Sequence, residues 1–124
     1  GGGGGYVEKV LTVAPTNSIS YSVGAGGAGA GQTTAPSGGN TTVTFSSTTY
    51  TASGGTGASD NGGDGAGGSA SNGDINISGS AGDKGSTWVN PGQSAGHGDY
   101  GRGGYYMGSE NGRAGVGGYV KFEW

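Results

Sequence analysis

The chain has 124 residues, of which 35 are glycine and three are proline, and its formal net charge is −3. Because cysteine is absent, disulfide frameworks and thiolate metal sites are excluded. No apolar run approaches the length needed to span a bilayer, and a pI near 4.7 leaves no basic stripe for nucleic acid.

The glycine content sets the main physical problem. Each glycine costs roughly 0.5–1 kcal/mol more backbone entropy on folding than alanine does. One leucine, three isoleucines, eight valines and two phenylalanines offer little apolar surface to offset that cost. The chain is therefore either a flexible linker or a single ordered domain over 1–124, in which backbone hydrogen bonds replace most of a core.

Alternating apolar and polar residues predict short strands separated by glycine tracts, near 6–13, 19–23, 41–52, 75–78 and 119–124. The turn signal Ala14-Pro15-Thr16-Asn17 suggests that the second strand returns antiparallel to the first. The segment 41–52 fits one long strand or two short ones. Essentially no α-helix is expected, because glycine, serine and threonine disfavour it.

Several glycines recur at a spacing of three, as in Gly62, Gly65 and Gly68 or Gly112, Gly115 and Gly118. Period three matches a left-handed extended helix with three residues per turn and no internal hydrogen bonds. Bare glycine edges let such helices approach and bond laterally. The predicted fold is thus mainly β, with polyglycine II-type helices packed as a sandwich beside short antiparallel strands. The alternative is a disordered low-complexity spacer.

Motifs for catalysis or cofactor binding are not assembled. Residues 24–29 match a dinucleotide pattern, but no helix-forming segment follows, so no cofactor is expected. His97 is the single histidine, and no serine stands in a nucleophile-elbow context. Asp60, Asp64 and Asp74 lie among asparagines, but their spacing fits no calcium loop and favours turn formation over metal binding. The chain is predicted not to be an enzyme.

Aromatic and charged residues concentrate between 86 and 113, where no alternating apolar pattern exists. Tyrosine and tryptophan on glycine-rich loops are typical of recognition surfaces, because they bring rigid area at low entropy cost. Individual rings could instead shield the strands or the glycine helices. The candidate contact residues are Trp88, His97, Asp99, Tyr100, Arg102, Tyr105 and Tyr106.

The segments 12–27, 38–45, 51–55 and 73–79, together with the closing Gly-Val-Gly-Gly-Tyr-Val-Lys-Phe-Glu-Trp of 115–124, carry a family pattern. In order and composition they resemble the glycine-rich C-terminal domain of tailed-bacteriophage tail fibres. The resemblance implies a receptor-binding tip at the distal end of a virion's fibre, commonly homotrimeric, which binds a bacterial surface protein or polysaccharide. It also implies variable contact loops, here 60–72 and chiefly 86–110.

Two rival interpretations belong to the structural class. One is a glycine-rich cap that ends a fibre without touching a receptor. The other is an ice-binding scaffold of polyglycine helices, which needs a flat, regular array of threonine or alanine on one face. The threonines cluster in 41–51, on strands, and the last third is aromatic and irregular, which argues against ice binding. A polysaccharide-trimming enzyme is the third alternative.

Overall fold

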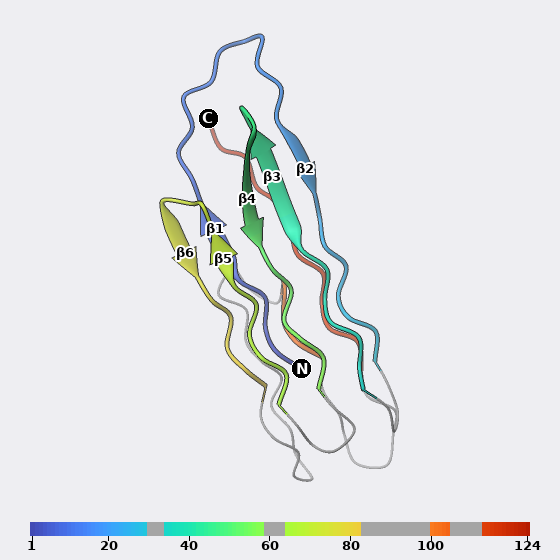
Figure 1. Cartoon of the computed structure of the whole chain (residues 1–124). Helices are drawn as coiled ribbons and strands as arrows, with labels where there is room; N and C mark the ends of the chain where they lie inside the picture. The colour runs from blue at the N-terminus through green and yellow to red at the C-terminus, as the bar shows by residue number, and fades with distance from the viewer. Residues whose placement is uncertain (30–33, 59–63, 83–99, 105–112) are drawn as a thin grey trace.

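The computed structural model describes residues 1–29, 34–58, 64–82, 100–104 and 113–124. These residues contain short β-strands and no helix, which confirms the predicted mainly β fold with short antiparallel strands. The strands lie towards one end of the molecule and the glycine tracts towards the other (Figure 1). In chain order the strands are β1 (Tyr6–Glu8), β2 (Ser20–Ser22), β3 (Thr41–Phe45), β4 (Thr48–Ala52), β5 (Ala70–Ser71) and β6 (Ile75–Ile77).

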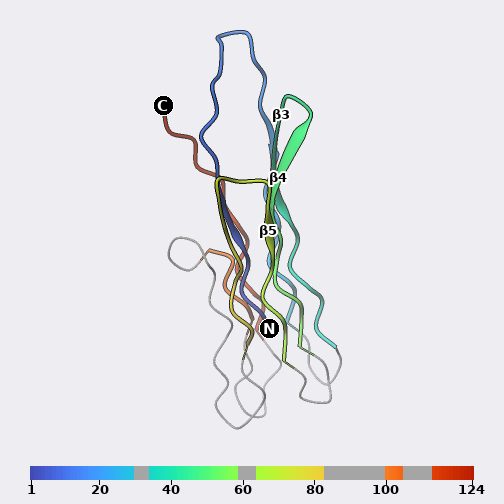
Figure 2. The same ribbon diagram turned by 60° about the vertical axis from the view of Figure 1, so that its left-hand side comes forward.

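The strands form two antiparallel sheets that stack as layers. One sheet has the order β2-β3-β4-β5, and the other pairs β1 with β6. β1 packs against β4 and β5, and Figure 2 separates the two layers. The expected pairing of the first strand with the second is therefore wrong. The segment between β1 and β2 crosses from one layer to the other, so β2 joins β3 instead.

Strand lengths differ from the prediction in two places for local reasons. The first strand ends at Glu8 and not near residue 13, because the Val10 N–H donates to the Asp74 carboxylate and not to a neighbouring strand. The segment 41–52 is a hairpin of two strands. Its turn residues Ser46 and Ser47 have φ of 49° and 64°, the left-handed conformation that two-residue hairpin turns favour.

Two further expectations need correction. Residues 119–124, predicted as a strand, form none; this segment contacts its neighbours through its rings, with Phe122 edge-on to Tyr21 at 5.7 Å. The predicted loop 60–72 contains β5, and its residues 64–69 form a glycine tract, because both segments find backbone partners in neighbouring chain segments.

The first tract, residues 1–5, makes lateral backbone hydrogen bonds whose direction rotates from residue to residue. The N–H groups of Gly2, Gly3, Gly4 and Gly5 donate in turn to the carbonyl oxygens of Thr56 (3.0 Å), Ser80 (2.9 Å), Gly101 (2.6 Å) and Ser53 (2.9 Å). The first and fourth donors thus reach the same neighbouring tract. A three-residue rotation is what a threefold helix with lateral bonds requires.

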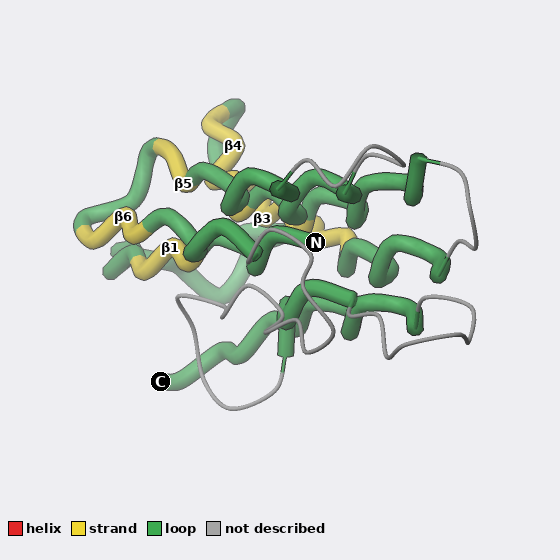
Figure 3. Tube along the Cα trace, turned by 90° about the horizontal axis from the view of Figure 1, so that it is seen from below, coloured by secondary structure: helices red, strands yellow, loops and turns green. Residues whose placement is uncertain are grey.

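The same lateral bonding joins the other tracts into two rows that continue the two sheets. The first row comprises 24–29, 34–39, 53–58 and 64–69, and the second comprises 79–82, 1–5, 100–104 and 113–118. Bonds within the first row include Gly38 N–H to Gly55 O (3.0 Å), and bonds between rows include Gly115 N–H to Gly27 O (2.9 Å). Figure 3 shows the tracts winding alongside one another. Their assignment as polyglycine II-type helices stays a prediction.

Backbone, and not side chains, fills the interior. Gly2, Gly3 and Gly4 are buried, whereas Tyr50, 9% exposed, is the one large apolar side chain that is buried among the described residues. A methyl group on Gly2 would overlap the carbonyl oxygen of Ala66, and one on Gly5 would overlap that of Ser69. Glycine at positions 2 and 5 is therefore a packing requirement, whereas a β-carbon on Gly1 or Gly4 would make ordinary contacts.

This packing predicts a sharp difference between two alanine substitutions. Gly2→Ala places a β-carbon against a neighbouring backbone, so we expect a loss of about 2 kcal/mol or more in the free energy of unfolding. At Gly38 the β-carbon would lie 3.5 Å from the Gly54 Cα, an ordinary contact, so Gly38→Ala should change stability by less than about 1 kcal/mol. Calorimetric melting of both variants checks the contrast.

A larger residue should have a larger effect. Gly65→Val would drive a β-carbon into the Thr56 carbonyl oxygen, and at Gly82 the β-carbon would lie 2.5 Å from the Gly1 carbonyl oxygen. Both valine variants should fail to fold. Normal melting of both would show that the tracts are a linker and not a packed array.

Candidate functional site

Two of the predicted contact residues, Tyr100 and Arg102, lie among the described residues. Trp88, His97, Asp99, Tyr105 and Tyr106 lie outside the described residues, so their place in the fold stays open. Tyr100 is 53% exposed, and Arg102 is half-buried with its carbonyl oxygen accepting from the Val116 N–H at 2.8 Å. The described part of the candidate site is therefore built around the start of the tract 100–104.

Three tyrosines meet where three neighbouring tracts end. Gly4 donates to Gly101, and Gly101 donates to Gly117 at 3.0 Å, so the tracts 1–5, 100–104 and 113–118 are aligned at this level. At this level the glycines of each tract are flanked by a tyrosine: Tyr6 follows Gly5, Tyr100 precedes Gly101, and Tyr119 follows Gly118. We call Tyr6, Tyr100 and Tyr119 the tyrosine cluster.

Two rings of the cluster are in contact, and all three residues are partly open to solvent. The Tyr100 and Tyr119 ring centres lie 4.7 Å apart, with the ring planes inclined at 41°. The Tyr6 hydroxyl donates to Glu8 Oε2 at 2.8 Å. That hydrogen bond is the main cause of a raised Tyr6 pKa, to which partial burial and the nearby Glu8, Tyr119 and Glu123 also contribute.

Charged groups border the cluster. Lys121 Nζ and Glu123 Oε1 form an exposed ion pair at 2.7 Å, and the hydrogen bond to Glu123 raises the Lys121 pKa. Sequence reasoning missed Tyr6, Glu8, Tyr119 and Glu123, because these residues were placed on predicted strands. The change from glycine to tyrosine at the end of each tract was the signal that could have found the tyrosines.

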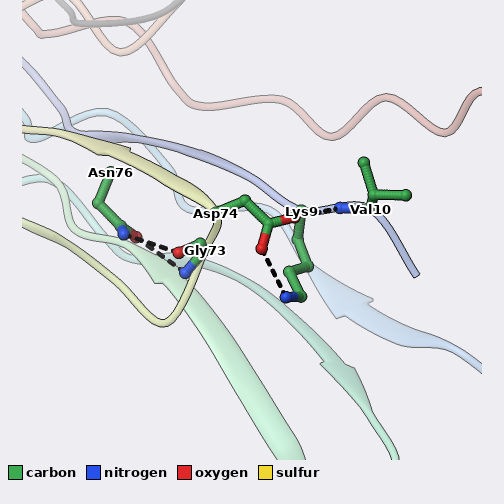
Figure 4. A network of polar contacts seen from close by, with 5 residues as sticks. All are labelled: Lys9, Val10, Gly73, Asp74 and Asn76. Atoms are coloured by element: carbon green, nitrogen blue, oxygen red, sulfur yellow. Dashed lines mark hydrogen bonds and ion pairs between the residues drawn. The ribbon is translucent and has the colours of Figure 1, made fainter.

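Asp74, considered above as a possible metal ligand, is used in a structural contact (Figure 4). Its carboxylate accepts from Lys9 Nζ at 2.6 Å and from the Val10 N–H at 2.9 Å, which holds the chain after β1 to the turn before β6. The Asn76 amide exchanges two hydrogen bonds of 2.9 Å with the Gly73 backbone. No group of three potential metal ligands gathers in the described ranges.

A second surface lies on the four-stranded sheet. Register aligns Ser20, Thr44 and Thr49 in one row, and Ser22, Thr42, Thr51 and Ser71 in the next. Because side chains alternate across a strand, all of these hydroxyls share one face. The opposite face carries Tyr21, Val43 and the buried Tyr50, so the hydroxyl face points away from the β1–β6 layer.

Comparison with known proteins finds no matching family model, no matching curated protein and no matching solved structure. Within the described ranges, no helix has the length and apolarity to cross a bilayer. Function must therefore be argued from the geometry of this chain.

The Asp74 contact predicts a pH-dependent contribution to stability. The hydrogen bonds from Lys9 and Val10 lower the Asp74 pKa. A carboxyl whose folded-state pKa is depressed contributes stability above its unfolded-state pKa and loses it as pH falls through the folded-state value. Asp74→Asn should therefore melt below the wild type at neutral pH, with the difference closing as the pH falls below about 4.

Melting temperatures measured across that pH range check this expectation. Lys9→Gln is the partial control, because it removes one partner and leaves the Val10 bond in place. Parallel curves for wild type and Asp74→Asn at all pH values would contradict the assigned role.

Proposed function

We propose that this chain is the receptor-binding tip of a bacteriophage tail fibre, an adhesin that attaches the virion to a bacterial surface protein or polysaccharide. In this proposal it sits at the distal end of the fibre, joined to the rest of the fibre and commonly in three copies. It acts by binding and not by catalysis. The support comes from the construction of the glycine tracts and from the composition of the segments that connect them.

The tracts are proposed to be polyglycine II-type helices. The three-residue rotation of the lateral hydrogen bonds supports this assignment. So does the backbone conformation, because among the described glycines Gly101 is the one with positive φ (72°). Negative φ is compatible with a left-handed threefold helix of the polyproline II type (φ about −75°), a conformation that the alanines and serines interspersed in the tracts can also adopt.

One observation carries the functional proposal: hydrogen bonds bring the ends of the tracts to the same end of the molecule. Ala35 donates to Ala58 at 3.0 Å, Gly82 donates to Gly65 at 2.9 Å, and Gly1 donates to Gly104 at 3.0 Å. These residues lie beside the segments 30–33, 59–63, 83–99 and 105–112. The last two of these contain Trp88, His97, Asp99, Tyr105 and Tyr106.

The scaffold itself makes few demands on side chains, so the connecting segments can vary without disturbing it. Its stability comes from main-chain bonds between tracts, and a change of sequence in a connecting segment removes none of these bonds. Stable scaffolds with variable connections are a common arrangement for recognition. A tip that must follow changing receptors gains from this separation.

Whole-cell binding tests the proposal. The purified chain should bind a susceptible bacterium, and Trp88→Ala or Tyr105→Ala should reduce binding at least tenfold without changing the melting temperature. Trp124→Ala is the matched control, because Trp124 is fully exposed and is not part of the predicted contact loops 60–72 and 86–110. If the purified chain binds no member of a broad panel of bacteria, the adhesin proposal is rejected and the purely structural fibre cap is the remaining interpretation.

Ice binding is a second candidate, because the structure supplies an array that the sequence did not reveal. The hydroxyl face repeats at about 4.8 Å between strands and about 6.8 Å along them. Thr44 and Thr49 are linked through their Oγ1 atoms at 2.9 Å, and the seven hydroxyl residues of the two rows include no charged group. A regular, uncharged hydroxyl surface is what an ordered water lattice can match.

Partition into a slowly growing ice hemisphere decides between the candidates. If the hydroxyl face binds ice, wild type should enter the ice and Thr49→Tyr should be excluded. Thr48→Tyr is the control, because Thr48 is exposed on the opposite face of the same strand. Exclusion of the wild type itself would remove this candidate.

A further inference from the structure

We propose that the tyrosine cluster is a subsite for an uncharged sugar of a bacterial surface glycan. The inference rests on the proposed function and names the chemical class of one receptor element. It concerns described residues at the boundary between tracts and strands, separate from the predicted loop residues 86–99 and 105–110.

Ring geometry is the first support. Tyr100 is about half exposed although it contacts Tyr119, so part of its surface stays open beside that contact. The apolar C–H face of a pyranose packs on such a ring. The two ring planes, inclined at 41°, offer a sugar contacts in two directions.

Preorganisation is the second support. Tyr100 directly precedes Gly101, whose N–H donates to Gly117 and whose carbonyl accepts from Gly4. Tyr119 lies on the same aligned set of tracts, directly after Gly118, whose N–H donates to Gly24 at 3.0 Å. Because the backbones beneath both rings are held by these bonds, little conformational entropy remains to be lost on binding.

Acceptors for sugar hydroxyls provide the third support. Glu8 is exposed and accepts one bond, from Tyr6. A carboxylate can accept several, so Glu8 retains capacity for a ligand hydroxyl. Two neighbouring hydroxyls of a sugar that donate to the Glu8 carboxylate would add directional hydrogen bonds to the stacking contact.

The charges near the cluster favour an uncharged sugar over an acidic one. Lys121 and Glu123 neutralise each other as an ion pair, and Glu8 adds a negative charge beside Tyr6. An acidic sugar or a phosphate group would meet that charge at short range, where like charges repel. A protein loop is the competing occupant, and the experiment separates it from a glycan.

An array of purified bacterial O-polysaccharides, neutral and acidic, is the probe. The complete chain should bind neutral members, and Tyr100→Ala should weaken that binding at least tenfold at unchanged melting temperature. Tyr21→Ala is the matched control, because Tyr21 is similarly exposed, at 61%, and pairs with Phe122 outside the cluster. Unchanged glycan binding by a folded Tyr100→Ala variant would overturn the inference.

Saturation-transfer NMR on the wild type gives a second measurement that does not depend on a variant folding. Irradiation of the tyrosine ring protons should transfer saturation to the C–H protons of a bound neutral oligosaccharide, and absence of transfer would count against the subsite. Cell binding that is lost after protease treatment of the cells, without any glycan binding, would overturn the subsite and leave the proposed function intact. Absence of cell binding would reject the proposed function itself.

Discussion

The structure depends on lateral backbone hydrogen bonds between tracts in which many glycines leave no room for a β-carbon. The tract 1–5 shows the constraint most clearly. Its neighbours supply acceptors on several sides, at Thr56, Ser80 and Gly101. The carbonyl groups of Ala66 and Ser69 lie where β-carbons on Gly2 and Gly5 would stand. Each buried peptide group must find a partner. Glycine allows the approach that satisfies this need, so the high glycine content is the physical basis of order in this chain.

The sheets depend on this array for their own stability. Isolated two- and three-residue strands are marginal in water, and Tyr50 is the single large apolar residue that they bury within the described part of the chain. Each strand, however, is continuous with a tract that lateral hydrogen bonds hold in place. β1 directly follows Gly5, and β4 leads directly into Ser53. Gly5 N–H donates to Ser53 O at 2.9 Å, which places the two layers against each other at the level where the strands begin. The strands therefore extend an existing alignment.

This dependence explains how far the sequence could predict the fold. Alternation identified the hairpin region 41–52, because Val43 and Phe45 before the turn and Tyr50 and Ala52 after it alternate with threonines. The same alternation predicted a strand at 119–124, a described segment in which the structure has none. Alternation shows which side chains share a face of a segment, but it does not show whether a neighbouring strand is there to pair with it. The pairing of β1 with β6 was equally hidden. It follows from which tracts lie side by side, and the repeated glycines of different tracts are too alike to specify a neighbour.

The candidate site was hidden for a related reason, and its position follows from the same constraint. Tyr100 was predicted to be a contact residue from its surroundings in the sequence, whereas Tyr6 and Tyr119 are distant from it along the chain. Within the array, a β-carbon is excluded at the glycines that face a neighbouring carbonyl group, such as Gly2 and Gly65. Large rings fit beside the aligned tracts 1–5, 100–104 and 113–118 only where the glycines end. At that end, each of the three tracts adjoins a tyrosine. An array built from bare backbone thus leaves room for large side chains where its tracts end, and the proposed sugar subsite lies at one such level, at the start of the strands.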